Sequence, residues 1–186
     1  MRTRTIGVAI PIPEPHAQEL QRVREGYGDP LARSIPTHVT LLAPVEVQAD
    51  DLDRIEKHLR TIAESEQPFE LHLRGTGTFQ PVSPVVYISI GLGFDDCQRV
   101  EARVRSGPLA ADPAFPYHPH VTVAHHLPGH VLRRAYEELA SYDVRFGVWG
   151  FSLYEHGPDG VWRPQRDFPL GTSLPGPVLH HGSPSP

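Results

Sequence analysis

The stretch His38-Val39-Thr40-Leu41 has a counterpart 82 positions later, in Pro119-His120-Val121-Thr122-Val123-Ala124. Side chains at positions i and i+2 of a β-strand point to the same face, and the residue between them points to the other. If each stretch is a strand, its histidine and threonine project together while its central valine faces a core. The sequence therefore predicts two matching strands, one in each half of the chain, each with a polar and a buried face.

These two motifs carry the functional groups that phosphoryl chemistry requires. A threonine hydroxyl can donate a hydrogen bond to a nonbridging phosphate oxygen. An imidazole can transfer a proton near neutral pH, or stabilise an anion when it is charged. Hydrolysis needs a base for water and an acid for the leaving oxygen, so two histidines that flank one phosphorus suffice without a metal. We therefore predict that His38, Thr40, His120 and Thr122 form one catalytic site.

The pattern must be weighed against chance. With 12 histidines in 186 residues, a single His-x-Thr triplet would carry no weight. Two triplets, each with an apolar central residue and an apolar residue after it, are much less frequent, although short motifs always produce some false matches. The alternative is a pair of ordinary strands whose histidines are half-exposed and idle.

Charge and composition narrow the expected partners. The net charge is −5 and no basic stretch is evident, which argues against a clamp on long nucleic acid. An RNA terminus or a small nucleotide remains a suitable substrate. A single cysteine, Cys97, excludes an internal disulfide. With no apolar leader and no apolar run that could span a bilayer, we expect a monomer in the cytoplasm without a membrane partner.

Apolar periodicity predicts the element order β-α-β-α-β-β-α-β-α-β-β. The expected strands cover residues 5–12, 37–44, 69–79, 85–92, 117–127, 144–154 and 161–168, with helices in the longer gaps. Asp50 is expected to cap the second helix, and residues 157–160 to turn a hairpin between the last two strands. Short turns favour antiparallel pairing and an α+β fold. We expect one domain over residues 1–170 and a disordered tail over 171–186, where Gly, Pro and Ser dominate.

The two motifs resemble the paired signature of the 2H phosphoesterase superfamily, in particular its branch of 2′-5′ RNA ligase-like proteins and 2′,3′-cyclic phosphodiesterases. Three further segments are similar to that family over about residues 3 to 170: Gly75–Phe79, Phe115–Pro119, and Phe151–Tyr154 followed by Trp162. The resemblance implies a bilobal α+β fold of pseudo-two-fold duplicated lobes, with mainly antiparallel sheets and a central cleft.

The resemblance also implies an activity: hydrolysis of 2′,3′-cyclic phosphates or 2′-5′ phosphodiesters, on RNA ends or small nucleotides, with no metal or other cofactor. His38 and His120 would then be the acid and the base, and Thr40 and Thr122 would hold phosphate oxygens. The sequence leaves open which histidine is which, and we favour His120 as the group that activates water.

Three further residues are candidates for substrate binding. Many relatives carry an arginine where this chain has His125, which could hold phosphate only when protonated. Strict alternation along the strand would place His125 on the face opposite to His120. Phe79 and Tyr117 could stack on a nucleobase, and ordinary packing is the equal alternative for both.

Other functions are compatible with the same residues. The chain could bind an RNA end or a nucleotide with little turnover, or it could catalyse the reverse reaction as a 2′-5′ RNA ligase. A metal-dependent hydrolase built on His118, His120 and His126 is a third alternative. It is weakened because no acidic residue lies near these histidines in the sequence, and metal sites usually draw on carboxylates as well.

Overall fold

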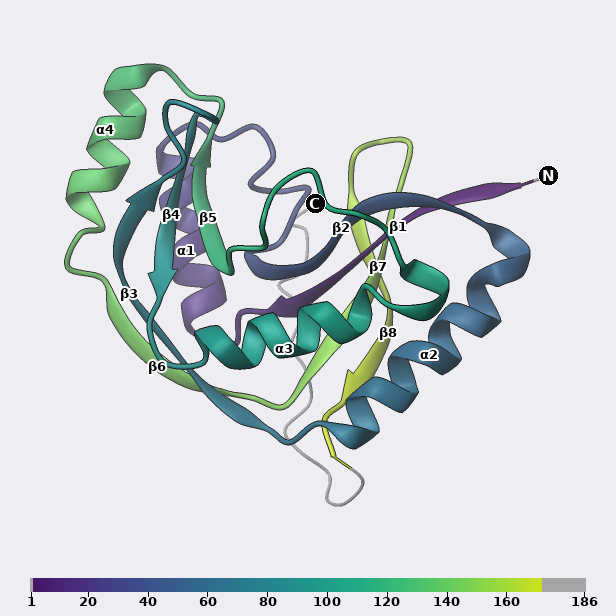
Figure 1. Ribbon diagram of the computed structural model, residues 1–186. Helices are drawn as coiled ribbons and strands as arrows, with labels where there is room; N and C mark the ends of the chain where they lie inside the picture. The colour runs from purple at the N-terminus through teal and green to yellow at the C-terminus, as the bar shows by residue number, and fades with distance from the viewer. Residues whose placement is uncertain (1, 172–186) are drawn as a thin grey trace.

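The computed structural model describes residues 2–171 and shows an α+β fold built on one curled antiparallel sheet (Figure 1). The predicted tail lies almost entirely outside the described residues. The eight strands lie in the order β6-β3-β4-β5-β2-β1-β7-β8. Their bounds are β1 (Thr3–Pro11), β2 (His38–Gln48), β3 (Phe69–Thr78), β4 (Val85–Ile90), β5 (His120–His125), β6 (Asp143–Val148), β7 (Gly150–His156) and β8 (Trp162–Pro169).

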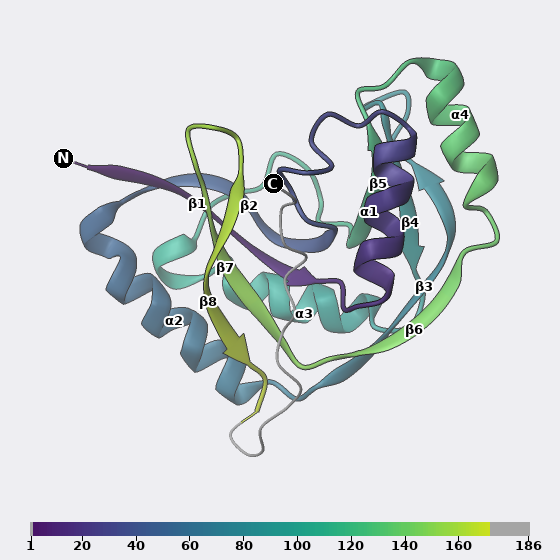
Figure 2. The same ribbon diagram turned by 180° about the vertical axis from the view of Figure 1, so that it is seen from behind.

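Four helices of the described chain cover this sheet, and each presents an apolar stripe to it (Figures 1 and 2). They are α1 (His16–Gly26), α2 (Leu52–Ser65), α3 (Phe94–Val104) and α4 (Gly129–Glu138). Helices α1 and α4 pack on the part of the sheet that contains β4 and β5, whereas α2 and α3 pack on the part that contains β2 and β8.

The sheet consists of two similar halves. Strands β2-β1-β7-β8 form one half and β5-β4-β3-β6 the other, and the halves join where β2 lies beside β5. Helix α1 follows β1 and packs on β5, just as α3 follows β4 and packs on β2. In each half, the helix that follows the second strand from the join thus packs on the other half. This equivalence confirms the predicted duplicated, pseudo-two-fold α+β architecture.

The join between the halves is also the centre of the two motifs. Val39 pairs with Val121 in the register of β2 and β5, and both side chains are fully buried in the core. The histidine and threonine on either side of each valine are only partly buried. The alternation predicted for both strands is therefore confirmed.

Two local predictions were wrong. Residues 144–154 were expected to form one strand, but the strand ends at Val148 and a new one begins at Gly150. Trp149 between them is 43% exposed, and the chain there leaves the edge of one half and joins β1 in the other. The alternation of apolar and polar residues in the sequence continues from β6 into β7. It therefore does not show that the chain changes its neighbouring strand at Trp149.

The start of the second helix also differs. A 3₁₀ turn over Ala49–Asp51 precedes α2, and no side chain caps the helix, so Asp50 is not its N-cap. The predicted hairpin is confirmed, because β7 and β8 pair antiparallel and the Gly157 N–H donates to the Val161 carbonyl across the turn.

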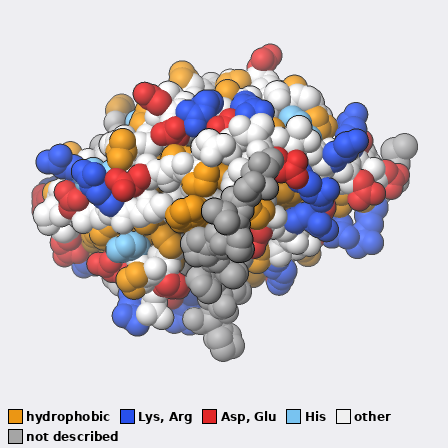
Figure 3. All heavy atoms as spheres, turned by 90° about the horizontal axis from the view of Figure 1, so that it is seen from below, with side chains coloured by type: hydrophobic (Ala, Val, Ile, Leu, Met, Phe, Trp, Pro, Cys, Tyr) orange, Lys and Arg blue, Asp and Glu red, His pale blue; other side chains and the backbone are white. Residues whose placement is uncertain are grey.

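The surface is mixed in charge where it is seen in Figure 3, with Lys and Arg side chains interspersed among Asp and Glu. Many of the arginines pair with a carboxylate, as in Arg163–Asp159 and Arg166–Glu56. In residues 2–171, no helix has the length and apolar character needed to cross a membrane.

Candidate active site

The four motif side chains converge because β2 and β5 run antiparallel as neighbours. With Val39 opposite Val121, the next step of the register in each direction sets His38 opposite Thr122 and Thr40 opposite His120. All four side chains leave the sheet on the face away from the buried valines. The structure thus brings the predicted histidines and threonines together around one point.

Each histidine is anchored in the same way. His38 Nδ1 lies 2.6 Å from the Pro36 carbonyl oxygen, and His120 Nδ1 lies 2.6 Å from the His118 carbonyl oxygen. Because a carbonyl only accepts, each Nδ1 carries the proton that it donates, and each neutral ring presents a basic Nε2. The Thr40 hydroxyl lies 3.1 Å from His38 Nε2 and can donate to it.

Burial favours the neutral form of both imidazoles. It lowers the pKa of His38 to about 4, an effect that the Pro36 carbonyl opposes and the positive charge of Arg24 reinforces. Burial also lowers the pKa of His120; the hydrogen bond to the His118 carbonyl opposes this effect, and the His118 side chain adds a smaller lowering. A phosphate anion between the rings would favour their charged forms, so substrate binding itself can supply the proton-donating state.

A cleft of about 170 Å³ opens beside the motifs. His38, Thr40 and Thr122 line it, while His120 stands next to this lining, across the β2–β5 join. Its remaining lining comes from α1, from the segment between α1 and β2, from the middle of β2, and from one end each of β5 and β8: Arg24, Asp29, Leu31, Ile35, Thr37, Ala43, Pro44, His125 and Trp162.

His125 faces the cleft because β5 contains a bulge. Tyr87 of β4 pairs with Thr122, but the preceding Val86 pairs with Ala124, so Val123 and Ala124 together oppose one residue. The extra residue reverses the alternation and places His125 on the same face as Thr122. Strict alternation pointed to the opposite face. The bulge is visible in the burial pattern of β5: Val123 and Ala124 are both buried, whereas buried and partly buried residues alternate in the rest of the strand.

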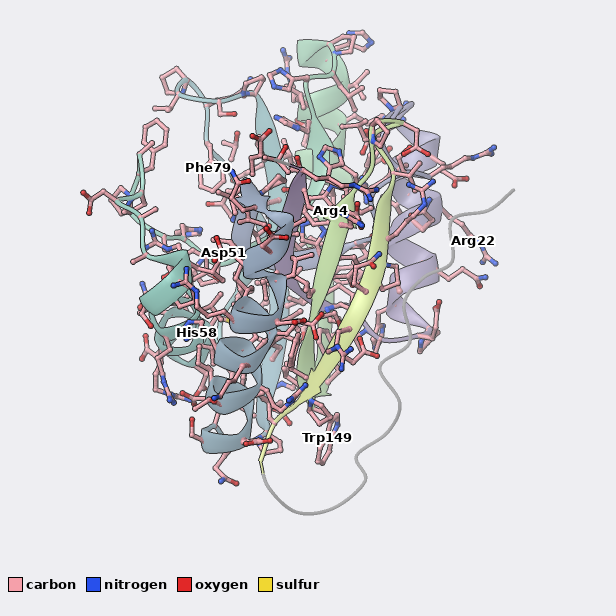
Figure 4. The ribbon with its side chains drawn as sticks, turned by 90° about the vertical axis from the view of Figure 1, so that its right-hand side faces the viewer. Arg4, Arg22, Asp51, His58, Phe79 and Trp149 are labelled. Carbon is pink, nitrogen blue, oxygen red and sulfur yellow. The ribbon has the colours of Figure 1, made fainter. Side chains whose placement is uncertain are left out.

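Phe79 and Tyr117 take different places. The Phe79 ring packs edge-to-face on His120, with ring centroids 4.8 Å apart, and lies at the end of the molecule opposite to Trp149 (Figure 4). The Tyr117 hydroxyl donates to the Thr40 carbonyl oxygen at 2.7 Å, which ties the segment before β5 to β2. Burial raises the pKa of Tyr117. We propose that Phe79 borders the substrate and that Tyr117 holds Thr40 in place.

Tyr117→Phe removes only the hydroxyl that binds Thr40. We expect the free energy of unfolding to fall by about 0.5–1.5 kcal/mol, the usual contribution of one hydrogen bond. Urea titration measures this loss, and Tyr136→Phe at an exposed tyrosine is the control. Equal stability in the two variants would contradict the assigned role of Tyr117.

Arg24 and Asp29 are cleft residues that the sequence analysis did not single out. The Arg24 guanidinium binds Asp29 Oδ2 through Nε and Nη2, each at 3.0 Å, and donates from Nη1 to the Ile35 carbonyl oxygen at 2.7 Å. Asp29 also accepts the Leu31 N–H. The pair therefore fixes the loop that walls the cleft. In the sequence, this pair is indicated only by the position of Arg24, which shares the apolar stripe of α1 with Leu20 and Val23.

The three histidines of the metal alternative do not gather in one place: His118 lies near His120, with ring centroids 6.2 Å apart, but His126 is not part of that pair. His118 packs against Phe79 and Phe94, whereas His126 stacks on His125 with ring centroids 4.0 Å apart. Within residues 2–171, no three His, Cys, Asp or Glu side chains come together as a metal-binding group.

Comparisons of this sequence with a family model and with individual proteins point to the same family. Residues 12–160 match the model of the 2′-5′ RNA ligase superfamily. A Geobacillus kaustophilus protein named "Putative phosphoesterase" is 30% identical over 139 residues, which are 74% of this chain and 80% of that protein. A Bacillus cytotoxicus protein of the same description is 34% identical over 105 residues, 56% of this chain and 60% of its own.

Solved structures show the same fold. The apo crystal structure of Escherichia coli LigT superposes with a TM-score of 0.65 at 20% identity, covering 92% of this chain and all (100%) of LigT. The crystal structure of the Thermus thermophilus protein TT0787 gives a TM-score of 0.62 at 22% identity, covering 91% of this chain and 100% of that protein.

Proposed function

The chain belongs to the 2′-5′ RNA ligase superfamily, and on that premise we propose that it is a metal-independent phosphoesterase that hydrolyses 2′,3′-cyclic phosphates or 2′-5′ phosphodiesters. The observation that carries the proposal is the set of two histidines and two threonines on one face of β2 and β5. A site that only bound phosphate would not require two oriented imidazoles on either side of it.

In this mechanism the phosphate lies between the two rings. Water attacks phosphorus and gives a proton to the neutral imidazole, and the bond from phosphorus to one ribose oxygen breaks as the charged imidazole protonates that oxygen. The sum is the addition of one water molecule. Thr40 and Thr122 donate hydrogen bonds to the nonbridging oxygens, whose charge grows in the transition state.

We assign the base to His120 and the acid to His38. Among the described contacts, His120 Nε2 makes no hydrogen bond, so it is open to a water molecule, whereas His38 Nε2 faces the Thr40 hydroxyl.

The proposed substrate class is an RNA terminus or a small nucleotide. Crystal structures of LigT have been determined with 3′-AMP, with ATP and with phosphate, which supports a nucleotide ligand for this chain too. We propose that His125 contacts phosphate when protonated and that Phe79 borders the base. A nucleotide-binding module with little turnover is the competing proposal.

The deciding experiment is turnover of a nucleoside 2′,3′-cyclic phosphate and of a 2′-5′-linked dinucleotide in EDTA. We expect product from at least one substrate, and the product isomer identifies the ribose oxygen that leaves. Thr40→Ala and Thr122→Ala should each lower kcat/KM about 10- to 100-fold, the effect of losing a hydrogen bond to a charged group.

Thr61→Ala is the control for these variants, since Thr61 is exposed and its hydroxyl donates to the Lys57 carbonyl of its own helix. If the wild type binds nucleotides but turns over neither substrate, the hydrolase proposal is wrong and the binding module is favoured. A product formed from a 2′,3′-cyclic end and a 5′-hydroxyl end would add ligase activity.

A further inference from the structure

His120 is held on one side by a hydrogen bond and on the other by aromatic rings. The bond from Nδ1 to the His118 carbonyl anchors a single atom, which leaves the ring free to swing about that point. The Tyr87 ring, with its centroid 5.2 Å from that of His120, and the Phe79 ring at 4.8 Å close two further sides. Phe79 and Tyr87 in turn pack on each other at 4.6 Å.

The Tyr87 ring can occupy this place only because a glycine lies beneath it. Gly77 of β3 pairs directly with Tyr87 of β4. A Cβ atom at Gly77 would come within 2.5 Å of two Tyr87 ring carbons and 2.6 Å of the Tyr87 hydroxyl oxygen. At such distances the Tyr87 ring would have to move away, and an aromatic ring laid across a strand glycine is a recognised way to fill such a site.

The other half of the sheet contains a looser version of the same arrangement. Trp162 packs against His38, with ring centroids 5.0 Å apart, and its outer edge lies over Gly7. A Cβ at Gly7 would meet Trp162 carbons at 3.5 and 3.6 Å, which is ordinary contact, and the Leu42 carbonyl oxygen at 3.3 Å, which is tight. The duplication therefore supports each histidine on an aromatic ring, but of these two glycines only Gly77 lacks all room for a side chain.

We propose that Tyr87 is a positioning residue for His120 and that Gly77 is required at its position because it lets the Tyr87 ring lie against that histidine. Tyr87 needs no contact with substrate for this role. It fixes the direction in which His120 Nε2 points, and a displacement of about 1 Å in a catalytic group can cost about 10²-fold in rate. The effect on rate rests on the proposed function, whereas the packing role does not.

The test uses Gly77→Ala, Tyr87→Leu and Tyr87→Phe, with Gly26→Ala as the control. Gly26 ends α1 and has nothing within 4 Å of an added Cβ. We expect Gly77→Ala and Tyr87→Leu to lower kcat about 10²-fold with little change in KM. Tyr87→Phe keeps the aromatic ring and should retain most of the wild-type kcat. Gly26→Ala should match the wild type.

NMR of the histidine rings supplies a readout that does not depend on turnover. The Hε1 resonance of His120 should shift in Gly77→Ala and Tyr87→Leu, because the ring current of Tyr87 moves or disappears, while that of His38 stays in place. Two titratable side chains, His118 and Tyr87, have rings that face His120. The charges of His38 and His120 also interact across the cleft. The resonances of His38, His118 and His120 are therefore recorded in the same spectra.

The outcomes separate the two proposals. A folded Gly77→Ala protein with an unchanged His120 resonance and an unchanged kcat overturns the positioning role. A shifted His120 resonance in a protein whose wild type hydrolyses neither substrate supports the packing role and overturns the proposed function. Equal losses of kcat in Gly77→Ala and Gly26→Ala would point to general destabilisation and would also overturn the role.

Discussion

Replacing either His38 or His120 with alanine is expected to lower kcat by about 10²–10⁴-fold, the range for loss of one general acid or base. Each ring has a separate task, since one accepts the proton of water and the other protonates the departing oxygen. Because the tasks belong to one step, the double variant should be little worse than the poorer single variant. The measurement is single-turnover hydrolysis of a nucleoside 2′,3′-cyclic phosphate in EDTA.

His130→Ala is the matched control, because His130 is exposed on α4 and is not one of the residues that line the cleft. Binding of a nucleotide should survive in both active-site variants, since Thr40, Thr122 and the cleft wall remain. Wild-type turnover in either His38→Ala or His120→Ala would refute the two-histidine mechanism. Additive losses in the double variant would show that the rings act in separate steps.

The part of the site that the sequence predicted is the part that strand alternation controls. His38 and Thr40 lie two positions apart in a regular strand, as do His120 and Thr122, so their shared face follows from local geometry. That the two faces would meet followed from the resemblance. The structure adds that the central valines pair directly, which sequence spacing does not reveal.

The parts that were missed depend on tertiary contacts or on local irregularity. The bulge at Val123–Ala124 reverses alternation, so His125 reaches the cleft against the strict pattern. Arg24 was not singled out, although its partner Asp29 lies only five residues further along the chain, because no pattern in the sequence shows that this pair is buried in the cleft wall. Gly77 gains its importance from the strand beside it, which no periodicity within β3 could indicate.

Arg24→Ala is expected to lower the free energy of unfolding by about 3–5 kcal/mol, the usual result of removing one partner from a buried ion pair. Arg24 and Asp29 are 5% and 8% exposed, so the carboxylate would be left without water or a counter-charge to replace the guanidinium. The Ile35 carbonyl would lose its hydrogen bond as well. Urea unfolding at neutral pH measures the loss.

Arg54→Ala on α2 is the control, since the Arg54–Asp51 pair has side chains 67% and 44% exposed. An exposed pair of this kind contributes at most about 1 kcal/mol. A double variant, Arg24→Ala with Asp29→Ala, removes both charges and should recover part of the stability, because no uncompensated carboxylate remains. Similar losses in Arg24→Ala and Arg54→Ala would contradict a buried, structural pair.

The same variant should also change the chemistry of His38. The charge of Arg24 contributes to the lowered pKa of His38, so its removal should raise that pKa, although burial will still keep it below its ordinary value. NMR titration of the His38 ring measures the change, with His120 as the internal reference. If His38 is the acid, a higher pKa leaves a larger fraction of it protonated at a given pH, so the pH at which kcat falls for lack of the protonated acid should also rise. An unchanged His38 titration would mean that Arg24 acts only by holding the cleft wall.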